Sequence, residues 1–301
     1  MIDSPDIPLN VSRSYLQADG AVKKISNYIT RKVGDKLNSL FKKDRKEFEK
    51  KWNDIKVVIE YGMLSEEKFF DKSKSFALYP TVDNNYYTFQ ELKDKISPNQ
   101  TDKDGKTIIL YTSNKDDQHS YIENAKTKGY EIILLDSPII SHLIQKLETS
   151  EENISFTRVD ADVIEKLIKK ESAEVSKLSE KEKEKLKKIV EDSVGKEKYT
   201  VQMEPMDSQN APFVITFPEF MRRMKEMQQT GGNNMFGNMP EMYNLIINVN
   251  NPIISEILKT KSKDKKDRLI NQSLDLAKLS QNLLKGKDLT SFIKRSIDFI
   301  K

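Results

Sequence analysis

The chain has 301 residues, which is enough for two or three domains of ordinary size. Its 51 Lys and Arg residues oppose 47 Asp and Glu residues, and the two signs are mixed along most of the sequence. A formal net charge of only +4 argues against nucleic acid or an acidic membrane surface as a partner. The chain has no cysteine, so disulfides, thiolate nucleophiles and cysteine-bound zinc are excluded.

No apolar run approaches the ~20 residues that span a bilayer, and the first residues lack the pattern of a signal peptide. We therefore expect a cytoplasmic protein with no membrane partner. His119 and His142 are the only histidines, and neither has the neighbours that metal binding or base catalysis requires. The sequence also lacks a glycine loop for phosphate and a nucleophile elbow, so it predicts no metal site and no complete catalytic site.

Helices are predicted for the first part of the chain. Apolar residues between positions 21 and 41 recur at three- and four-residue spacing, as on one face of a helix. A second, charged helix follows, and Gly62 is its expected end. A short helix is then expected at 66–76.

After these helices the pattern changes to alternating helices and strands. Thr88 and Glu91 form a capping-box pattern for a helix that should end before Pro98. Two β-rich runs, at 107–111 and 130–135, are predicted to be buried strands with a helix between them. Strands joined in this way lie parallel with a right-handed crossover, so a small α/β/α layer is expected.

The composition becomes polar near residue 152, where we place a domain boundary. Ser179 and Glu182 then form another capping box, at the start of an exposed helix in which opposite charges alternate. Further strands are expected at 199–203, 213–216 and 243–248.

The end of the chain carries two amphipathic helices separated at Gly286. Two short helices at a chain end cannot bury both apolar faces completely in each other. They need a partner, and an identical copy of the chain is the commonest one. The sequence therefore predicts a homodimer. The candidate interface residues are Leu274, Ala277, Leu283, Leu284, Phe292, Ile293 and Ile297.

A methionine-rich stretch lies between the predicted strands of the second half. Met221, Met224 and Met227 recur at three-residue spacing, and Phe220 stands just before them. One interpretation is an ordinary core face. The other is an adaptable surface for apolar partners, because thioethers are flexible and the segment that follows is rich in Gly, Asn and Met. The spacing leaves both interpretations open.

Arg13 stands in an irregular, Pro-rich stretch at the start of the chain. Gln17 is four residues further on, so a helical turn would put both side chains on one side. A planar guanidinium held there can clamp a phosphate and stabilise charge on a transferring phosphoryl group. The alternative is a surface ion pair with a neighbouring carboxylate. Spacing does not decide between the two.

The opening residues closely resemble the catalytic-loop pattern of the ninety-kilodalton heat-shock chaperone family, Hsp90, of the bacterial type. They are Asp6-Ile7-Pro8-Leu9-Asn10-Val11-Ser12-Arg13, with Leu16-Gln17 after them. The resemblance reaches the closing helices and so covers essentially the whole chain. Its intermediate blocks are Lys23-Lys24-Ile25, Trp52, Tyr61-Gly62, Tyr111-Thr112-Ser113 and residues 125–131.

The resemblance implies a chaperone with an N-terminal ATP-binding domain, a middle domain and a C-terminal dimerisation domain. In this chain, residues 1–19 would be the catalytic loop, 20–151 the end of the middle domain and 152–301 the dimerisation domain, with the ATP-binding domain outside the sequence. Arg13 would then contact the γ-phosphate of ATP and Mg held by that absent domain, supported by Gln17. The chain alone is expected to hold no cofactor and not to act as an enzyme.

The resemblance also assigns the methionine stretch, with Phe220, to the binding of non-native client proteins. It assigns the last two helices to a four-helix bundle across a dimer axis, and other chaperones could be further partners. The expected fold class is α/β, or more broadly α+β: N-terminal helices, a small α/β/α layer, and a dimerisation domain with a small mixed sheet.

Two features depart from the family pattern. The family often has Asn-Pro-x-His-Pro before the dimer helices, whereas this chain has Asn248-Val249-Asn250-Asn251-Pro252, and residues 229–240 are longer and richer in Met and Asn than expected. The alternative function is a dimeric scaffold or adaptor without a chaperone role. A stand-alone phosphotransfer enzyme comes third, because no phosphate loop or metal site accompanies Arg13.

Overall fold

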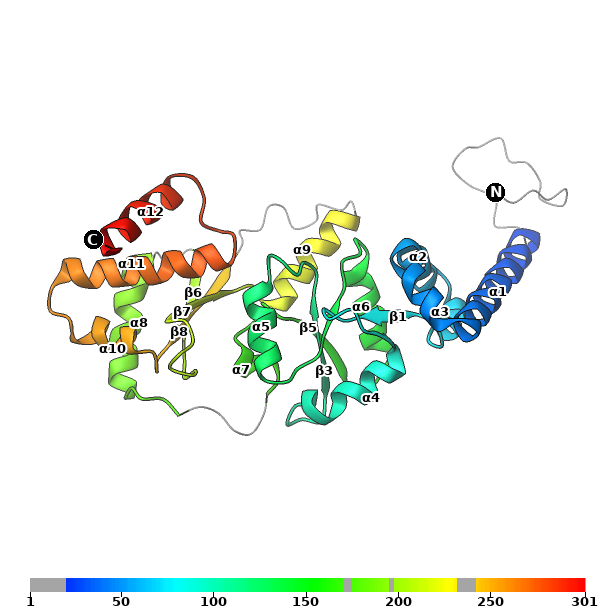
Figure 1. Ribbon diagram of the computed structural model, residues 1–301, viewed down its shortest axis with the longest axis horizontal. Coiled ribbons are helices and arrows are strands. Elements are labelled where there is room, and N and C mark those ends of the chain that lie inside the picture. The colour runs from blue at the N-terminus through cyan, green and yellow to red at the C-terminus, as the bar shows by residue number, and fades with distance from the viewer. Residues whose placement is uncertain (1–19, 170–174, 195–197, 232–241, 301) are drawn as a thin grey trace. The chain divides into compact units, whose positions relative to one another are not determined.

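The computed structural model describes residues 20–169, 175–194, 198–231 and 242–300 (Figure 1). Within these ranges the chain folds as a mixture of α and β structure, with small sheets of two or three strands. The predicted fold class is therefore confirmed. The chain divides into two compact units, one within Met1–Pro80 and Asn85–Lys93, and one within Thr81–Asn84 and Asp94–Lys301. The division at residues 19 and 151 stays a prediction.

In its described residues, the first unit contains three helices, the start of a fourth and an antiparallel strand pair around an aromatic core. Its elements are α1 (Gly20–Lys43), α2 (Arg45–Ser65), α3 (Glu67–Ser73), β1 (Leu78–Pro80) and β2 (Tyr86–Thr88). The rings of Phe48 and Phe76 meet edge to face, with 6.4 Å between their centroids. Trp52 and Phe70 are also buried, so aromatic packing holds these short elements together.

Gly62 does not end α2, because the helix continues to Ser65. A Cβ atom at this position would lie 2.9 Å from two ring atoms of Phe69. The glycine therefore permits the ring of Phe69, on α3, to approach the backbone of α2 closely. The sequence pattern was correct in marking a special position, but the reason is packing and not helix termination.

The capping box at Thr88 is present and is extended by an arginine. The amide of Thr88 donates to Glu91 Oε2 at 2.8 Å at the start of α4 (Phe89–Gln100). Arg45 also donates to the Glu91 carboxylate, with distances of 2.5 and 2.8 Å. The hydrogen bond from Arg45 lowers the pKa of Glu91 to about 2.

The predicted end of α4 before Pro98 is wrong, because the helix runs to Gln100. Gln100 is buried, donates to the carbonyl of Ile108 at 2.9 Å and accepts from the amide of Glu131 at 2.6 Å. These two bonds to the neighbouring sheet stabilise the last turn of α4. Their stabilisation is larger than the loss of the one helical hydrogen bond that Pro98, without an N–H group, cannot form.

The second unit begins with a three-stranded parallel sheet in the order β4-β3-β5 (Figure 1). Its strands are β3 (Thr107–Thr112), β4 (Ile132–Leu134) and β5 (Ile154–Arg158). Helices α5 (His119–Thr127) and α7 (Ile164–Leu167) share a core with Ile108 and Leu110 on one face. Helix α6 (Ile140–Ser150) packs beside β5. The strand β5, which completes this sheet, was not predicted from the sequence.

A second, mixed sheet follows in the order β6-β8-β7, with β6 and β8 parallel. Figure 1 labels its three strands. Its strands are β6 (Tyr199–Glu204), β7 (Phe213–Thr216) and β8 (Tyr243–Asn248), as predicted to within a residue at each end. One face is covered by α8 (Glu180–Val194), α10 (Pro252–Lys259) and α11 (Lys263–Ser280).

The last helix, α12 (Gly286–Ile300), follows α11 after a turn at Gly286. Gly286 has a φ of +57°, a conformation in which glycine avoids the clash of a side chain. The two predicted closing helices are thus confirmed, and so is the capping box of α8, where the amide of Ser179 donates to Glu182 Oε2 at 2.9 Å. The short helix α10 was not predicted.

Candidate functional site

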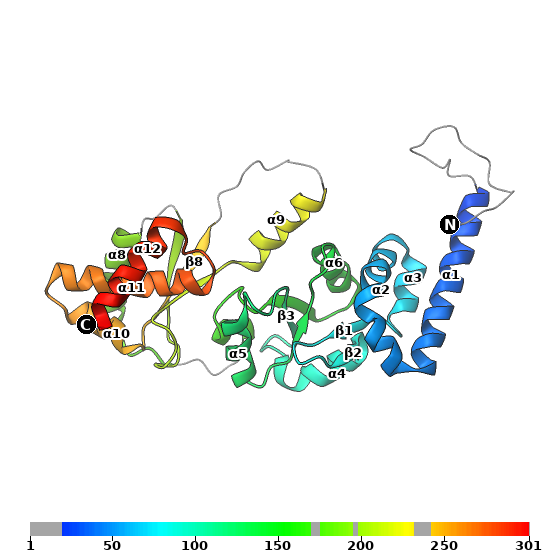
Figure 2. The same ribbon diagram turned by 45° about the horizontal axis from the view of Figure 1, so that its top comes forward.

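The methionine stretch forms helix α9 (Glu219–Gly231), which lies beside α6 in the second unit (Figures 1 and 2). Its side chains divide into two faces. Charged residues recur at positions 219, 222, 223 and 226, which share one side of a helix. Phe220, Met224 and Met227 share another side, at four- and three-residue spacing. We call these the ionic face and the apolar face.

Glu219 is the centre of the ionic face. Its carboxylate accepts hydrogen bonds from Tyr111 Oη at 2.8 Å and from the amide of Arg158 at 3.1 Å. It also accepts from Arg223 Nε at 2.7 Å and lies 2.5 Å from Arg222 Nη2. Burial raises the pKa of Glu219, but the charges of the two arginines outweigh this and hold it below its usual range.

Arg222 is almost completely buried, which is unusual for an arginine. It hydrogen-bonds to Tyr111 Oη, and its guanidinium carbon lies 5.4 Å from the centre of the Tyr111 ring. Glu226 accepts from its Nη1 at 2.8 Å. Burial by itself would lower the pKa of Arg222, and the charge of Glu219 raises it above its usual value. The group therefore stays cationic in the interior.

Arg223 ties α9 to the neighbouring α6 and β5. Its Nη1 donates to Glu148 Oε2 at 2.7 Å, and its Nη2 donates to the carbonyl of Phe156 at 2.6 Å. Glu148 in turn accepts from the amide of Phe156 at 2.7 Å. One side of α9 is thus bonded to the sheet and to α6 by charged groups with several partners each, which fixes the helix orientation.

The apolar face has a different environment. Phe220 is 70% exposed, and Met221, Met224 and Met227 are half-buried. The structure therefore brings the four residues together on one helix, as the spacing predicted, but places none of them among the fully buried core residues. Sequence reasoning missed the ionic face, because its partners Tyr111 and Glu148 lie far away in the chain.

The predicted dimer residues occupy two environments. Leu274, Ala277, Leu284 and Phe292 are buried within their own chain, and Leu283 is half-buried. Ile293 and Ile297, on α12, are 49% and 48% exposed.

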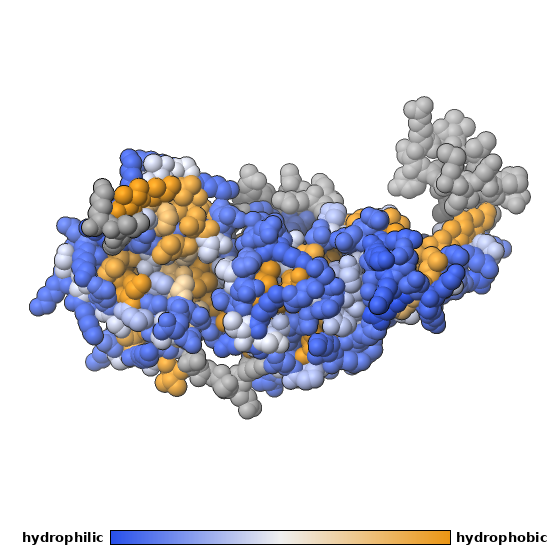
Figure 3. Space-filling model, in the orientation of Figure 1, coloured by the Kyte–Doolittle hydropathy of each residue, from blue (hydrophilic) through white to orange (hydrophobic). Residues whose placement is uncertain are grey.

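Helix α11 exposes two further large apolar side chains, Leu276 and Leu279. Figure 3 shows apolar surface gathered on α12. Leu276 and Leu279 were not among the predicted interface residues, although they stand in the sequence as a second apolar row on the same helix, three residues apart. Arg13 and Gln17 lie outside the described residues, so their predicted role stays a prediction.

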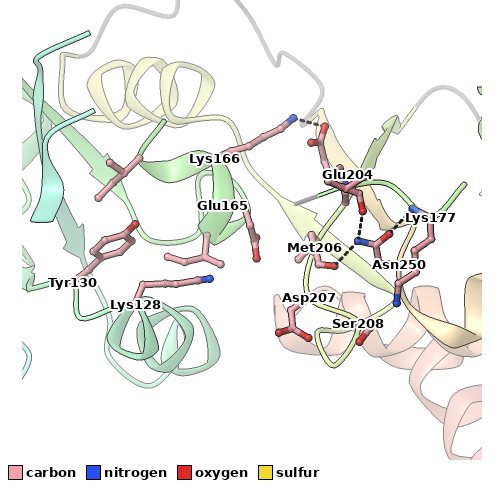
Figure 4. Close-up of a pocket in the computed structure, with 14 residues that line it drawn as sticks. Lys128, Tyr130, Glu165, Lys166, Lys177, Glu204, Met206, Asp207, Ser208 and Asn250 are labelled. Atoms are coloured by element: carbon pink, nitrogen blue, oxygen red, sulfur yellow. Dashed lines mark hydrogen bonds and ion pairs between the residues drawn. The ribbon is translucent and has the colours of Figure 1, made fainter. Parts of the chain in front are cut away.

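The second unit also contains a cavity of about 830 Å³ (Figure 4). Its charged residues include an ion pair in which Lys166 Nζ lies 2.5 Å from Glu204 Oε1. Asn250 donates to the carbonyl of Met206 at 3.1 Å and accepts from the amide of Lys177 at 2.9 Å. These bonds connect segments distant in the sequence. The hydroxyl of Ser208, which also lines the cavity, forms no hydrogen bond with a basic side chain of the described residues, as a nucleophile activated for hydrolysis would.

Other kinds of site find no support in the described part of the chain. No group of three or more His, Asp or Glu residues there could hold a metal ion. His119 is exposed on α5 and His142 is half-buried on α6. Among the described helices, none combines the length and the apolar character needed to cross a membrane.

Comparisons with known proteins agree with the motif resemblance. The family model described as Hsp90 protein matches residues 1–292. The chaperone protein HtpG of Bacteroides thetaiotaomicron is 40% identical over 100% of this chain and 54% of its own length. HtpG of Porphyromonas gingivalis is 41% identical over 93% of this chain and 41% of its own length. The chain thus spans about half the length of the curated relatives it matches, and it belongs to the Hsp90 family of chaperones.

Proposed function

We propose that this chain is the client-binding and dimerising part of an Hsp90-type chaperone. The main observation behind the proposal is that α9 has both an ionic face and an apolar face, in a chain that belongs to the Hsp90 family. The ionic face is bonded to α6 and to the sheet, so the helix has a fixed orientation. The apolar face carries Phe220, which is 70% exposed in a chain that is one-third charged.

Non-native proteins expose apolar segments of many shapes. Methionine suits such partners because its unbranched, polarisable side chain adapts to different surfaces. Phe220 adds a large apolar area that is already exposed to solvent. We therefore assign Phe220, Met221, Met224 and Met227 to client binding.

The exposed apolar residues of the closing helices support a homodimer. Leu276 and Leu279 on α11, with Ile293 and Ile297 on α12, are each between 43% and 49% exposed. Large apolar side chains exposed together on neighbouring helices are typical of an interface, and a second copy of the chain is the commonest partner. The proposed dimer contact is therefore centred on these four residues, with Leu283 and Phe292 behind them.

The ATP-related role follows from family membership alone. We propose that Arg13, supported by Gln17, acts on the γ-phosphate of ATP that the nucleotide-binding domain of a full-length protein would bind together with Mg. In a full-length protein, Arg13→Ala should lower the rate of ATP turnover, because a cation that stabilises the transferring phosphoryl group is lost. An unchanged rate would remove this assignment.

The client assignment is tested by changing Met221, Met224 and Met227 together to Ser and measuring suppression of client aggregation. We expect suppression to fall while the dimer persists. The matched control is Met242→Ser, which alters an exposed methionine outside α9. Unaltered suppression by the triple variant would contradict the assignment and favour a dimeric scaffold without a chaperone role.

The dimer is tested by sedimentation of a variant with Ile293→Asp and Ile297→Asp. We expect monomers at micromolar concentration, because two carboxylates would be buried in the apolar contact. The control Lys287→Asp adds a carboxylate at an exposed position of the same helix and should leave the dimer intact. Dimers of equal affinity in all three proteins would exclude this contact.

A further inference from the structure

The first unit contains a cationic cavity that the proposed function does not use. It lies between α1 and α3 and has a volume of about 440 Å³. Four of the residues that line it are cations, namely Lys24, Arg31, Lys68 and Lys72, and none is a carboxylate. Lys68 and Lys72 are one helical turn apart, and Lys24 and Arg31 are two turns apart, so each pair shares a helix face.

Over the whole chain the two signs nearly balance, with 51 basic and 47 acidic residues. The charged residues that line this cavity, in contrast, are all basic. Cations that converge on one concave surface repel each other, so bringing them together has an electrostatic cost that a bound anion would relieve. Lys24 and Lys68 form no hydrogen bond or ion pair with any other residue in the described ranges. Their charges are therefore available to an anion.

Two of the four cations are held in place before any ligand arrives. The guanidinium carbon of Arg31 lies 5.6 Å from the centre of the Tyr28 ring, in a cation–π contact. Lys72 Nζ lies 2.5 Å from Asp35 Oδ1, and the hydrogen bond from Lys72 lowers the pKa of Asp35. Gly34 lets the Lys72 stem pack on α1, since a Cβ there would lie 2.7 Å from Lys72 Cδ.

The remaining lining groups are neutral and polar. Asn27 and Thr30, both on α1, offer an amide and a hydroxyl beside the cations. Neutral donors of this kind orient a ligand that the charges attract. The volume of the cavity is typical of sites that bind small molecules. A folded protein would not fit into it.

We propose that this cavity binds a small polyanion that carries several phosphate groups. A phosphate accepts two parallel hydrogen bonds from an arginine and single bonds from lysines, which matches one arginine among three lysines. A chain of phosphates spreads its charges over several groups, as the cations here are spread over two helices. The proposal does not rest on the role assigned to Arg13, on client binding or on dimerisation.

The test is calorimetric titration of the whole chain with inorganic tripolyphosphate, at low and at physiological salt. We expect saturable binding that weakens with salt. The variant with Arg31→Gln and Lys68→Gln should lose affinity by about tenfold or more, because both side chains are exposed cations of the cavity. The control with Lys36→Gln and Lys46→Gln removes two exposed cations outside the cavity and should change the affinity by less than about twofold.

Equal loss in the two double variants would show a non-specific charge effect and would overturn the proposal, as would the absence of binding to the unaltered chain. A second titration with a hexaglutamate peptide separates phosphate chemistry from acidic peptide recognition. Tighter binding of the peptide than of tripolyphosphate would overturn the phosphate assignment. All of the variants alter exposed side chains, and unchanged thermal unfolding would confirm that they fold.

Discussion

Arg223 of α9 and Glu148 of α6 form an ion pair with 2.7 Å between Nη1 and Oε2, although 75 positions separate them in the chain. Both side chains are mostly shielded from solvent, and the same guanidinium donates to the backbone of β5. A buried pair with additional hydrogen bonds fixes geometry more than it adds stability. Here it determines that the ionic face of α9 is turned to the sheet, while Phe220 on the apolar face stays exposed.

Replacing Arg223 with Met should destabilise the protein by about 2–4 kcal/mol, because Glu148 and Glu219 would lose a partner while remaining largely buried. Urea denaturation monitored by circular dichroism measures the effect. The control is Lys225→Met, an exposed cation on the same helix. A loss of stability no larger than that of the control would show that the ion pair does not anchor α9.

The α9 helix shows what the sequence could and could not predict. The three-residue spacing of the methionines indicated a helical stripe, but it left open whether that stripe belongs to the core or to a surface for partners. The ionic face could not be found, because an arginine that follows another arginine in a charged chain resembles an ordinary solvated position. Its burial depends on Tyr111 of β3 and Glu148 of α6, and only the folded chain brings these two elements to α9.

The pair of Arg45 and Glu91 predicts a specific dependence on acid. The pKa of Glu91 is lowered to about 2. The ion pair therefore adds its full stabilisation to the folded state above the ordinary pKa of a glutamate, and this stabilisation is lost as the pH falls toward 2. Glu91→Gln should therefore cost about 1 kcal/mol at neutral pH, a modest value because the carboxylate is 42% exposed.

The difference between the unaltered chain and Glu91→Gln should shrink between about pH 5 and pH 2 when unfolding free energies are measured by denaturant titration. Glu152→Gln, at an exposed position, serves as the control and should show a smaller difference at neutral pH. A difference that stays constant over this range would argue against the ion pair.

Replacing each of two helical glycines with alanine should change the stability of the fold in opposite directions. At Gly62 the new Cβ would lie 2.9 Å from the buried ring of Phe69, so we expect a net loss of about 1–2 kcal/mol. At Gly34 the close atom is Cδ of the flexible Lys72, so the higher helix propensity of alanine should raise stability by up to about 1 kcal/mol. Thermal unfolding compares the two, and shifts of the same sign would contradict the packing account.

Among the polar residues, Asn248 should be one of those whose replacement destabilises the fold most. It is fully buried, donates to the carbonyl of Asp207 at 2.8 Å and accepts from the amides of Met206 and Asn250. Asn248→Ala should cost about 2–4 kcal/mol in unfolding free energy, because these buried groups lose their partner. Asn244→Ala, at a half-buried position of the same strand, should cost less than half as much.

The structure also explains the departure from the family pattern after β8. Asn250 bonds to the carbonyls of Val175 and Met206, and Asn251 caps α10 by accepting from the amide of Ile253 at 2.9 Å. Local capping boxes at Thr88 and Ser179 could be predicted because both partners lie within four residues. The roles of Asn248 and Asn250 could not, since their partners come from segments that are distant in the sequence.

The central claim is that non-native protein binds the apolar face of α9. Photo-crosslinking tests it most directly, with benzoylphenylalanine placed at Phe220 in one protein and at Lys225, on a different side of the helix, in another. Incubated with an unfolded client and irradiated, the first protein should form a covalent adduct and the second should not. Equal crosslinking from both positions, or none from position 220 while aggregation is still suppressed, would contradict the claim.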